Sequence, residues 1–123
     1  MSPALKTFIA ATFPSVWTLE VLCHLRARRE QAFDRDALVG ELRASGLVID
    51  QSLNRLSAAG LVLVDESGAA RFAPADARLD ALSGEAEDFY AKSPDAVRRL
   101  IVAAANPGVA AFADAFKLKG DQG

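Results

Sequence analysis

The sequence predicts a mainly α-helical fold with a small β-wing, and three observations support this prediction. Over most of the chain, apolar residues recur at spacings of three and four, as on one face of a helix. Residues 61–64 instead form a continuous β-prone run directly after Gly60. A turn signal at 65–68 then separates this run from a second short strand at 71–73. We therefore expect helices packed around one two-stranded hairpin.

A single domain over residues 1–123 is expected, because a chain of 123 residues that is 51% hydrophobic can bury one core but hardly two. No apolar run approaches the roughly 18 residues that span a bilayer. The first residues also lack the plan of a secretion signal. We therefore predict a cytoplasmic protein without a membrane partner. The lone cysteine, Cys23, is predicted to be a small buried hydrophobe.

Two helices are expected before the hairpin unit. Residues 1–12 form an N-terminal helix that begins at Ser2 and Pro3. Its apolar side consists of Leu5, Phe8 and Ile9. The second helix runs from Val16 to about Arg29, after a break at Pro14. It is expected to carry four side chains into the core, namely Trp17, Leu19, Leu22 and Cys23.

A third helix is expected to start after Asp34, whose carboxylate can accept a bond from a free backbone N–H. Phe33 and Leu38 are placed for a hydrophobic staple across this start. Ser45 and Gly46 are expected to break the helix, with Gly46 in the left-handed conformation that often ends helices. Two apolar anchors then follow, Leu47 and Ile49.

The next helix is expected to bury Ile49, Leu53 and Leu56, which follow the spacing of one apolar stripe, and to stop at Gly60. Six polar residues are then expected on or near its solvent side, namely Asp50, Gln51, Ser52, Asn54, Arg55 and Ser57. Pro74 either ends the returning strand of the hairpin that follows or places that strand at an edge.

Helices are expected again over residues 75–118. Asp76 caps the first of them, and Pro94 and Pro107 each begin a further one. Their apolar stripes are Leu79, Leu82, Ala86 and Phe89, then Val97, Leu100, Ile101 and Ala104, then Val109, Phe112 and Phe116. The first helix has an acidic outer surface made by Asp80, Glu85, Glu87 and Asp88. Residues 119–123 are expected to be a flexible tail.

The order of helix, turn, helix and hairpin is the layout of a winged helix-turn-helix, here over residues 13–74. Residues 53–62, Leu-Asn-Arg-Leu-Ser-Ala-Ala-Gly-Leu-Val, most visibly resemble the winged-helix transcription regulators of bacteria, MarR-like proteins among them. The resemblance implies that the second motif helix enters the major groove of DNA and that the wing reaches the neighbouring backbone or minor groove. By this resemblance four side chains face base edges or phosphates, namely Gln51, Ser52, Asn54 and Arg55.

Charge is the main objection to DNA binding, because the chain carries a net charge of −2. Residues 61–92 contain three basic and seven acidic groups and therefore hold most of the negative charge. Asp65 and Glu66, at the wing turn, would be repelled by phosphate. We therefore expect phosphate contacts from Arg71 on the wing and from Arg43 on the first motif helix.

Dimerisation would give the apolar N-terminal and last helices something to pack on, and residues 75–118 are therefore a candidate dimerisation extension. The alternative is that both helices fold back over the core of one chain. A small-molecule effector is a further possibility, because a pocket between the motif and the added helices would lie around Trp17, Phe89 or Tyr90. The sequence does not name such an effector.

The sequence gives no support for an enzyme, a cofactor or a metal site, since it has one histidine, one cysteine and no phosphate-cradling glycine loop. Two hypotheses remain. The first is a DNA-binding transcriptional regulator that acts as a homodimer on double-stranded DNA. The second is a winged-helix module that docks onto a protein partner through the acidic stretch from Asp76 to Asp88 and the apolar end helices, and that has little or no affinity for DNA.

Overall fold

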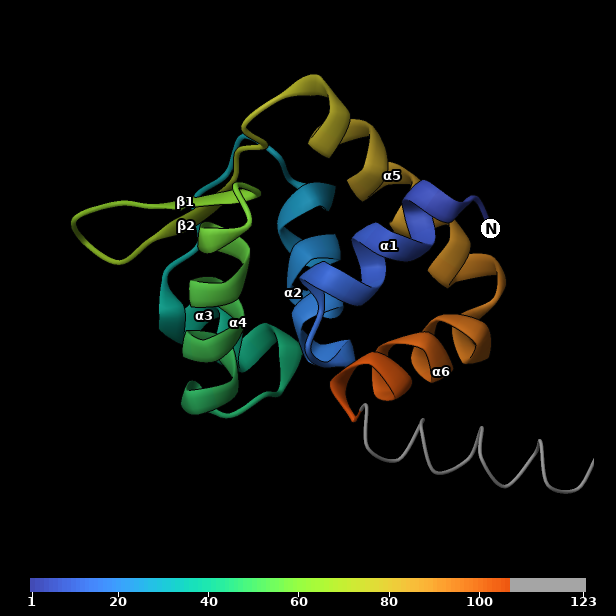
Figure 1. Cartoon of the computed structure of the whole chain (residues 1–123). Coiled ribbons are helices and arrows are strands. Elements are labelled where there is room, and N and C mark those ends of the chain that lie inside the picture. Colours follow the sequence, from blue (N-terminus) through green and yellow to red (C-terminus); the bar gives the residue numbers. More distant parts are fainter. Residues whose placement is uncertain (107–123) are drawn as a thin grey trace, which may run out of the picture.

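The computed structural model describes residues 1–106, which form six helices and one two-stranded antiparallel sheet (Figure 1). The elements are α1 (Pro3–Thr12), α2 (Val16–Ala27), α3 (Arg35–Leu42), α4 (Gly46–Ala58), β1 (Val62–Val64), β2 (Ala70–Phe72), α5 (Ala77–Lys92) and α6 (Pro94–Ala105). The mainly helical fold with a small sheet is confirmed. The final helix with Val109, Phe112 and Phe116, and the tail at 119–123, lie outside the described residues.

Helix α2 lies at the centre of the molecule and packs against α3, α4, α5 and β2 (Figure 1). Its Leu19, Leu22 and Leu25 side chains are fully buried. Helix α1 packs on α5 and α6 of the same chain, and its Leu5, Phe8 and Ile9 side chains are buried there. Of the two alternatives for the N-terminal helix, the structure therefore supports packing within one chain.

Three predicted helix caps are present. Ser2 Oγ accepts from the backbone N–H of Leu5 at 3.1 Å, Asp34 Oδ1 from that of Ala37 at 2.7 Å, and Asp76 Oδ1 from that of Leu79 at 2.8 Å. Each satisfies a backbone donor that the helix leaves free, which typically stabilises a protein by about 1 kcal/mol. These local signals explain why the helix starts were predictable.

The turn between α3 and α4 differs from its prediction. Arg43 takes the left-handed conformation after α3 (φ 54°), and Ser45 caps α4, whereas Gly46 is already helical. A Cβ at Gly46 would meet the guanidinium of Arg35, the end of a flexible side chain that could shift to make room. Gly60 does take the left-handed conformation (φ 76°), so the predicted stop after α4 is confirmed.

The hairpin pairs Val62 with Phe72 and Val64 with Ala70. At its turn, the carboxylate of Asp65 accepts backbone N–H bonds from Ser67 and Ala69 at 2.9 and 3.0 Å. On its other edge, β2 exchanges two backbone hydrogen bonds of 2.8 Å between Ala70 and Phe33. The segment just before α3 is thereby hydrogen-bonded to β2, the returning strand of the hairpin.

Trp17 is not part of the core, contrary to its prediction, because 41% of its surface is exposed. Leu19 and Leu22, which were predicted to enter the core from the same helix, are fully buried. Cys23 is mostly buried, and burial raises the pKa of its thiol to about 12, which leaves it protonated at neutral pH. Within residues 1–106, no single helix combines the length and the apolarity needed to cross a membrane.

Candidate nucleic-acid interface

The inner face of α4 holds the helix in place. Ile49, Leu53 and Leu56 are buried as predicted, and α4 packs on α2, α3 and β1. Ser52 is buried too, with 2% of its surface exposed, and its Oγ lies 3.3 Å from Thr18 Oγ1 of α2. The prediction that Ser52 faces solvent and a base edge is therefore wrong, because its hydroxyl pairs with another hydroxyl inside the protein.

The outer face of α4 is an uncharged row of exposed residues, defined here as the outer row. It consists of Leu47, Gln51, Asn54 and Ala58. Side-chain hydrogen bonds from α4 and its cap to other described residues involve Ser45, Asp50, Ser52 and Arg55. Within residues 1–106 the amides of Gln51 and Asn54 thus have no protein partner.

Leu47 is the most exposed large apolar residue described, at 66%, and the expectation that it anchors the turn is wrong. The sequence contained a signal for this, since Leu47 precedes the buried Ile49 by two positions, or about 200° around a helix. The two side chains must therefore point in nearly opposite directions. A similar signal existed for Ser52, which lies three residues after Ile49 and four before Leu56, on the buried stripe.

Arg55 is exposed but turned toward α1. Its Nη2 donates to the carbonyl oxygen of Ala11 at 3.0 Å, near the end of α1, where backbone carbonyls lack helical partners and the helix dipole is negative. This contact occupies part of the guanidinium, which has five N–H donors in all. Arg43, by contrast, is exposed at the end of α3 and has no carboxylate partner among the described residues.

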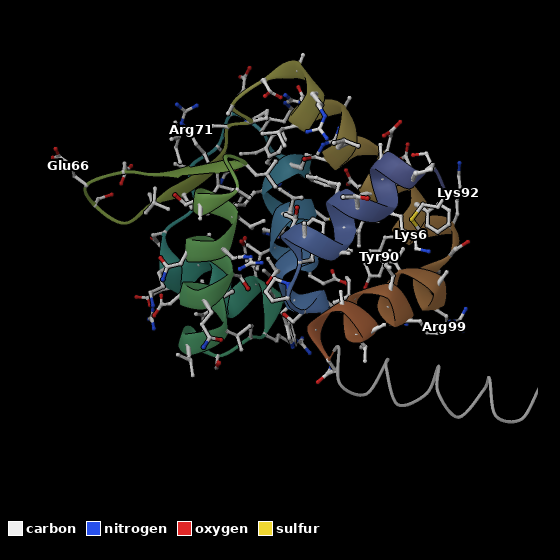
Figure 2. The ribbon with its side chains drawn as sticks, in the orientation of Figure 1. Lys6, Glu66, Arg71, Tyr90, Lys92 and Arg99 are labelled. Atoms are coloured by element: carbon white, nitrogen blue, oxygen red, sulfur yellow. The ribbon has the colours of Figure 1, made fainter. Side chains whose placement is uncertain are left out.

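Arg71 lies on the far face of the hairpin. Its neighbours on β2, Ala70 and Phe72, are buried toward the core, and strand residues alternate between faces. Figure 2 shows Arg71 pointing away from α4 and Glu66 at the hairpin tip. The structure therefore does not bring Arg71 to the outer row, and it places an acidic side chain at the tip instead.

A groove of about 720 Å³ separates α4 and the start of α3 from the hairpin. Three carboxylates, of Asp34, Asp36 and Asp50, and one guanidinium, of Arg35, line it. Arg35 donates to both carboxylate oxygens of Asp50 at 2.7 and 3.2 Å, and these hydrogen bonds lower the pKa of Asp50. Three negative charges and one positive charge leave the groove at −2, which repels a phosphate backbone.

A smaller hollow of about 240 Å³ lies where α2, α3, α5 and α6 meet. Trp17 and Tyr90, two of the residues named for an effector pocket, line it together with Glu20 and Arg98. The Tyr90 hydroxyl donates to Glu20 Oε1 at 2.5 Å, and burial raises the pKa of that hydroxyl. Phe89, the third residue named for that pocket, does not line the hollow. No ligand is assigned to this hollow.

No cluster of three or more potential metal-ligating side chains occurs in the part of the chain that the structure describes. His24 lies 2.9 Å from Glu41 and packs edge-on against Phe33, so it joins α2 to α3. No protein-family model, curated protein or solved structure matches this chain. The function must therefore be argued from the residues themselves.

Proposed function

We propose that this protein is a DNA-binding transcriptional regulator of the winged helix-turn-helix type, with α3 and α4 as the two motif helices and β1 and β2 as the wing. The observation that carries the proposal is the outer row of α4, which is exposed, uncharged and without a protein partner. The strand bond between Phe33 and Ala70 supports it, because it places the hairpin beside the motif helices.

In this proposal α4 lies in the major groove and supplies most of the contacts. The amides of Gln51 and Asn54 are suited to reading base edges, since each combines a donor with an acceptor. Arg43 would contact a phosphate. Arg55 would contact DNA through the guanidinium N–H donors that are not bonded to Ala11. The acidic groove and Glu66 argue against a close phosphate contact by the wing tip.

A homodimer remains part of the proposal. Two-fold regulators place two recognition helices about one DNA turn apart and recognise inverted repeats. Because α1 is packed within the chain, a dimer would have to use other surfaces. Val102 on α6 is 57% exposed and lies close in sequence to the predicted last helix. We therefore propose the end of α6 as the dimer interface to test first.

The test is to cross-link a tagged copy of the protein to DNA in its native cell and sequence the recovered fragments. We expect discrete sites that share an inverted repeat. The double variant Gln51→Ala with Asn54→Ala should lose these sites, because each bidentate amide–base pair discriminates against a wrong base by about 1–3 kcal/mol. Gln31→Ala, which removes an exposed amide outside α4, is the matched control and should keep them. No enrichment over the untagged strain would contradict the proposal.

The acidic groove supports a second function, docking of a partner protein with a basic surface. The substitution Glu66→Lys separates the two, and it is a cleaner site than Asp65, whose carboxylate holds the hairpin turn. Glu66→Lys should strengthen nonspecific DNA binding if the tip approaches phosphate. It should weaken capture of a basic protein partner if that partner fills the groove and also contacts the hairpin tip, since Glu66 lies beside the groove and does not line it.

A further inference from the structure

The side chains of the outer row restrict which base pairs α4 could recognise in the proposed complex with DNA. From the exposure and spacing of Leu47, Gln51 and Asn54, we infer that each recognition helix reads A·T base pairs, with Leu47 packed on a thymine methyl group and the two amides paired with adenines. This inference rests on the proposed function and specifies the substrate of the same site.

The three side chains are spread over a length of helix comparable to a few base pairs. Leu47 and Asn54 are seven residues apart, which is about 10 Å along a helix at 1.5 Å per residue. Base pairs are stacked about 3.4 Å apart, so this length covers about three steps. Gln51 lies between them on the same face, and the small exposed Ala58 lets the end of the row approach the DNA.

Leu47 can make only one kind of favourable base contact. It is 66% exposed at the first turn of α4, the end of a recognition helix that usually reaches the bases. The thymine methyl group is the apolar feature of the major groove, and packing against it would remove both surfaces from water.

The amides favour adenine for a complementary reason. Adenine presents an acceptor at N7 and a donor at N6, which match the donor and acceptor of one carboxamide. Guanine presents two acceptors and is best read by arginine or lysine. The outer row contains neither, and the nearest guanidinium on α4, that of Arg55, is bonded to Ala11 on the α1 side.

The experiment begins with selection of duplexes from a randomised library by the purified full chain. Each thymine in the recovered duplex is then replaced by uracil, which removes the methyl group and leaves the hydrogen-bonding edge intact. We expect one replacement in each half-site to weaken binding about fourfold, the effect of one buried methyl group.

Two variants make the result specific. Leu47→Ala should bind the thymine and uracil duplexes equally, because its methyl contact is gone. Leu63→Ala removes a leucine that is exposed to a similar degree on the hairpin, at 55%, and should keep the full uracil effect. A further pair of duplexes, with adenine or 7-deazaadenine, should be distinguished by the wild type and not by Gln51→Ala with Asn54→Ala.

The outcomes separate this inference from the function on which it rests. Recovered sites with G·C pairs at the contacted positions would overturn it, as would uracil insensitivity of the wild type or an unchanged uracil effect in Leu47→Ala. In each case DNA binding itself would stand. Failure to recover any duplex would overturn the proposed function and this inference together.

Discussion

Helices α4 and α5 both carry polar side chains that face away from the core, but the two helices use them differently. On α5, Asp80 accepts hydrogen bonds from Arg29 of α2 at 3.1 and 2.8 Å, and Glu87 pairs with Arg26. On α4, the outer-row amides have no partner within residues 1–106. Similar polar patterns in a sequence can thus serve folding in one helix and remain available for a ligand in another.

The comparison also weakens the docking hypothesis for α5. Its predicted acidic surface contained four carboxylates, and two of them are paired with α2. Glu85 and Asp88 are the exposed remainder. The groove beside α4 carries a net charge of −2 although Arg35 pairs with Asp36 and Asp50 there, so a basic protein partner in this groove would compete with the proposed DNA for the same part of the molecule.

The largest effect on stability should come from the buried side of α4. Leu56→Ala removes a fully buried side chain and should lower the free energy of unfolding by about 2–5 kcal/mol, measured by urea denaturation. Leu47→Ala, on the outer side of the same helix, should change it by less than about 0.5 kcal/mol. Equal losses in the two variants would contradict the two-sided description of α4.

A smaller effect is expected from the α2–α5 contact. Arg26→Ala removes the partner of Glu87 and a side chain that packs beside Gly84 and over the ring of Phe72. We expect a loss of about 1–3 kcal/mol by chemical denaturation. The control is Arg99→Ala on α6, an exposed arginine (Figure 2), which should be close to neutral. A neutral Arg26→Ala would mean that α5 is held by its apolar face alone.

The buried hydroxyl pair should contribute less. Ser52→Ala leaves Thr18 without this partner and should cost about 1 kcal/mol. Ser57→Ala, at an exposed position of α4, gains the same helix propensity and serves as the reference. The difference between the two variants, from paired thermal unfolding curves, isolates the hydroxyl contact. A difference of zero would show that the contact adds nothing to stability.

The smallest effect concerns pH. Hydrogen bonds from Arg29 lower the pKa of Asp80 below its ordinary value of 3.8. At pH values above the ordinary pKa, a carboxylate whose pKa is lowered in the folded state stabilises that state. This stabilisation is lost as the pH falls through the lowered pKa. The stability difference between wild type and Asp80→Asn should therefore shrink on acidification. Melting temperatures that keep a constant gap from neutral to strongly acidic pH would contradict the assignment.

Local features of the fold were predictable because their causes are local. The caps at Ser2, Asp34 and Asp76 each involve a side chain and a backbone N–H three residues later. The stop at Gly60 needs only a residue that tolerates a positive φ. Neither requires knowledge of what packs against the helix.

Contacts between distant segments are the part of the candidate site that helical spacing could not predict. The Thr18–Ser52 pair joins residues 34 positions apart, and Arg35 reaches Asp50 across 15 positions. Helical spacing alone placed Gln51 and Asn54 correctly on the exposed side of α4. It does not predict which partner a long arginine side chain at the edge of that side will bond. Arg55 turned to Ala11 of α1, a partner that no pattern within α4 could reveal.

The two backbone hydrogen bonds between Phe33 and Ala70 make the intervening chain a closed loop whose entry and exit lie next to each other. Helices α3 and α4 and the hairpin tip all belong to this loop, whereas α1, α2, α5 and α6 lie outside it. The inner face of α4 is shared with the rest of the molecule, because Ile49, Leu53 and Leu56 are buried in the core and α4 packs on α2. The side chains proposed to contact DNA nevertheless all lie between positions 34 and 69, so a change of target sequence would require substitutions only on the exposed side of this loop.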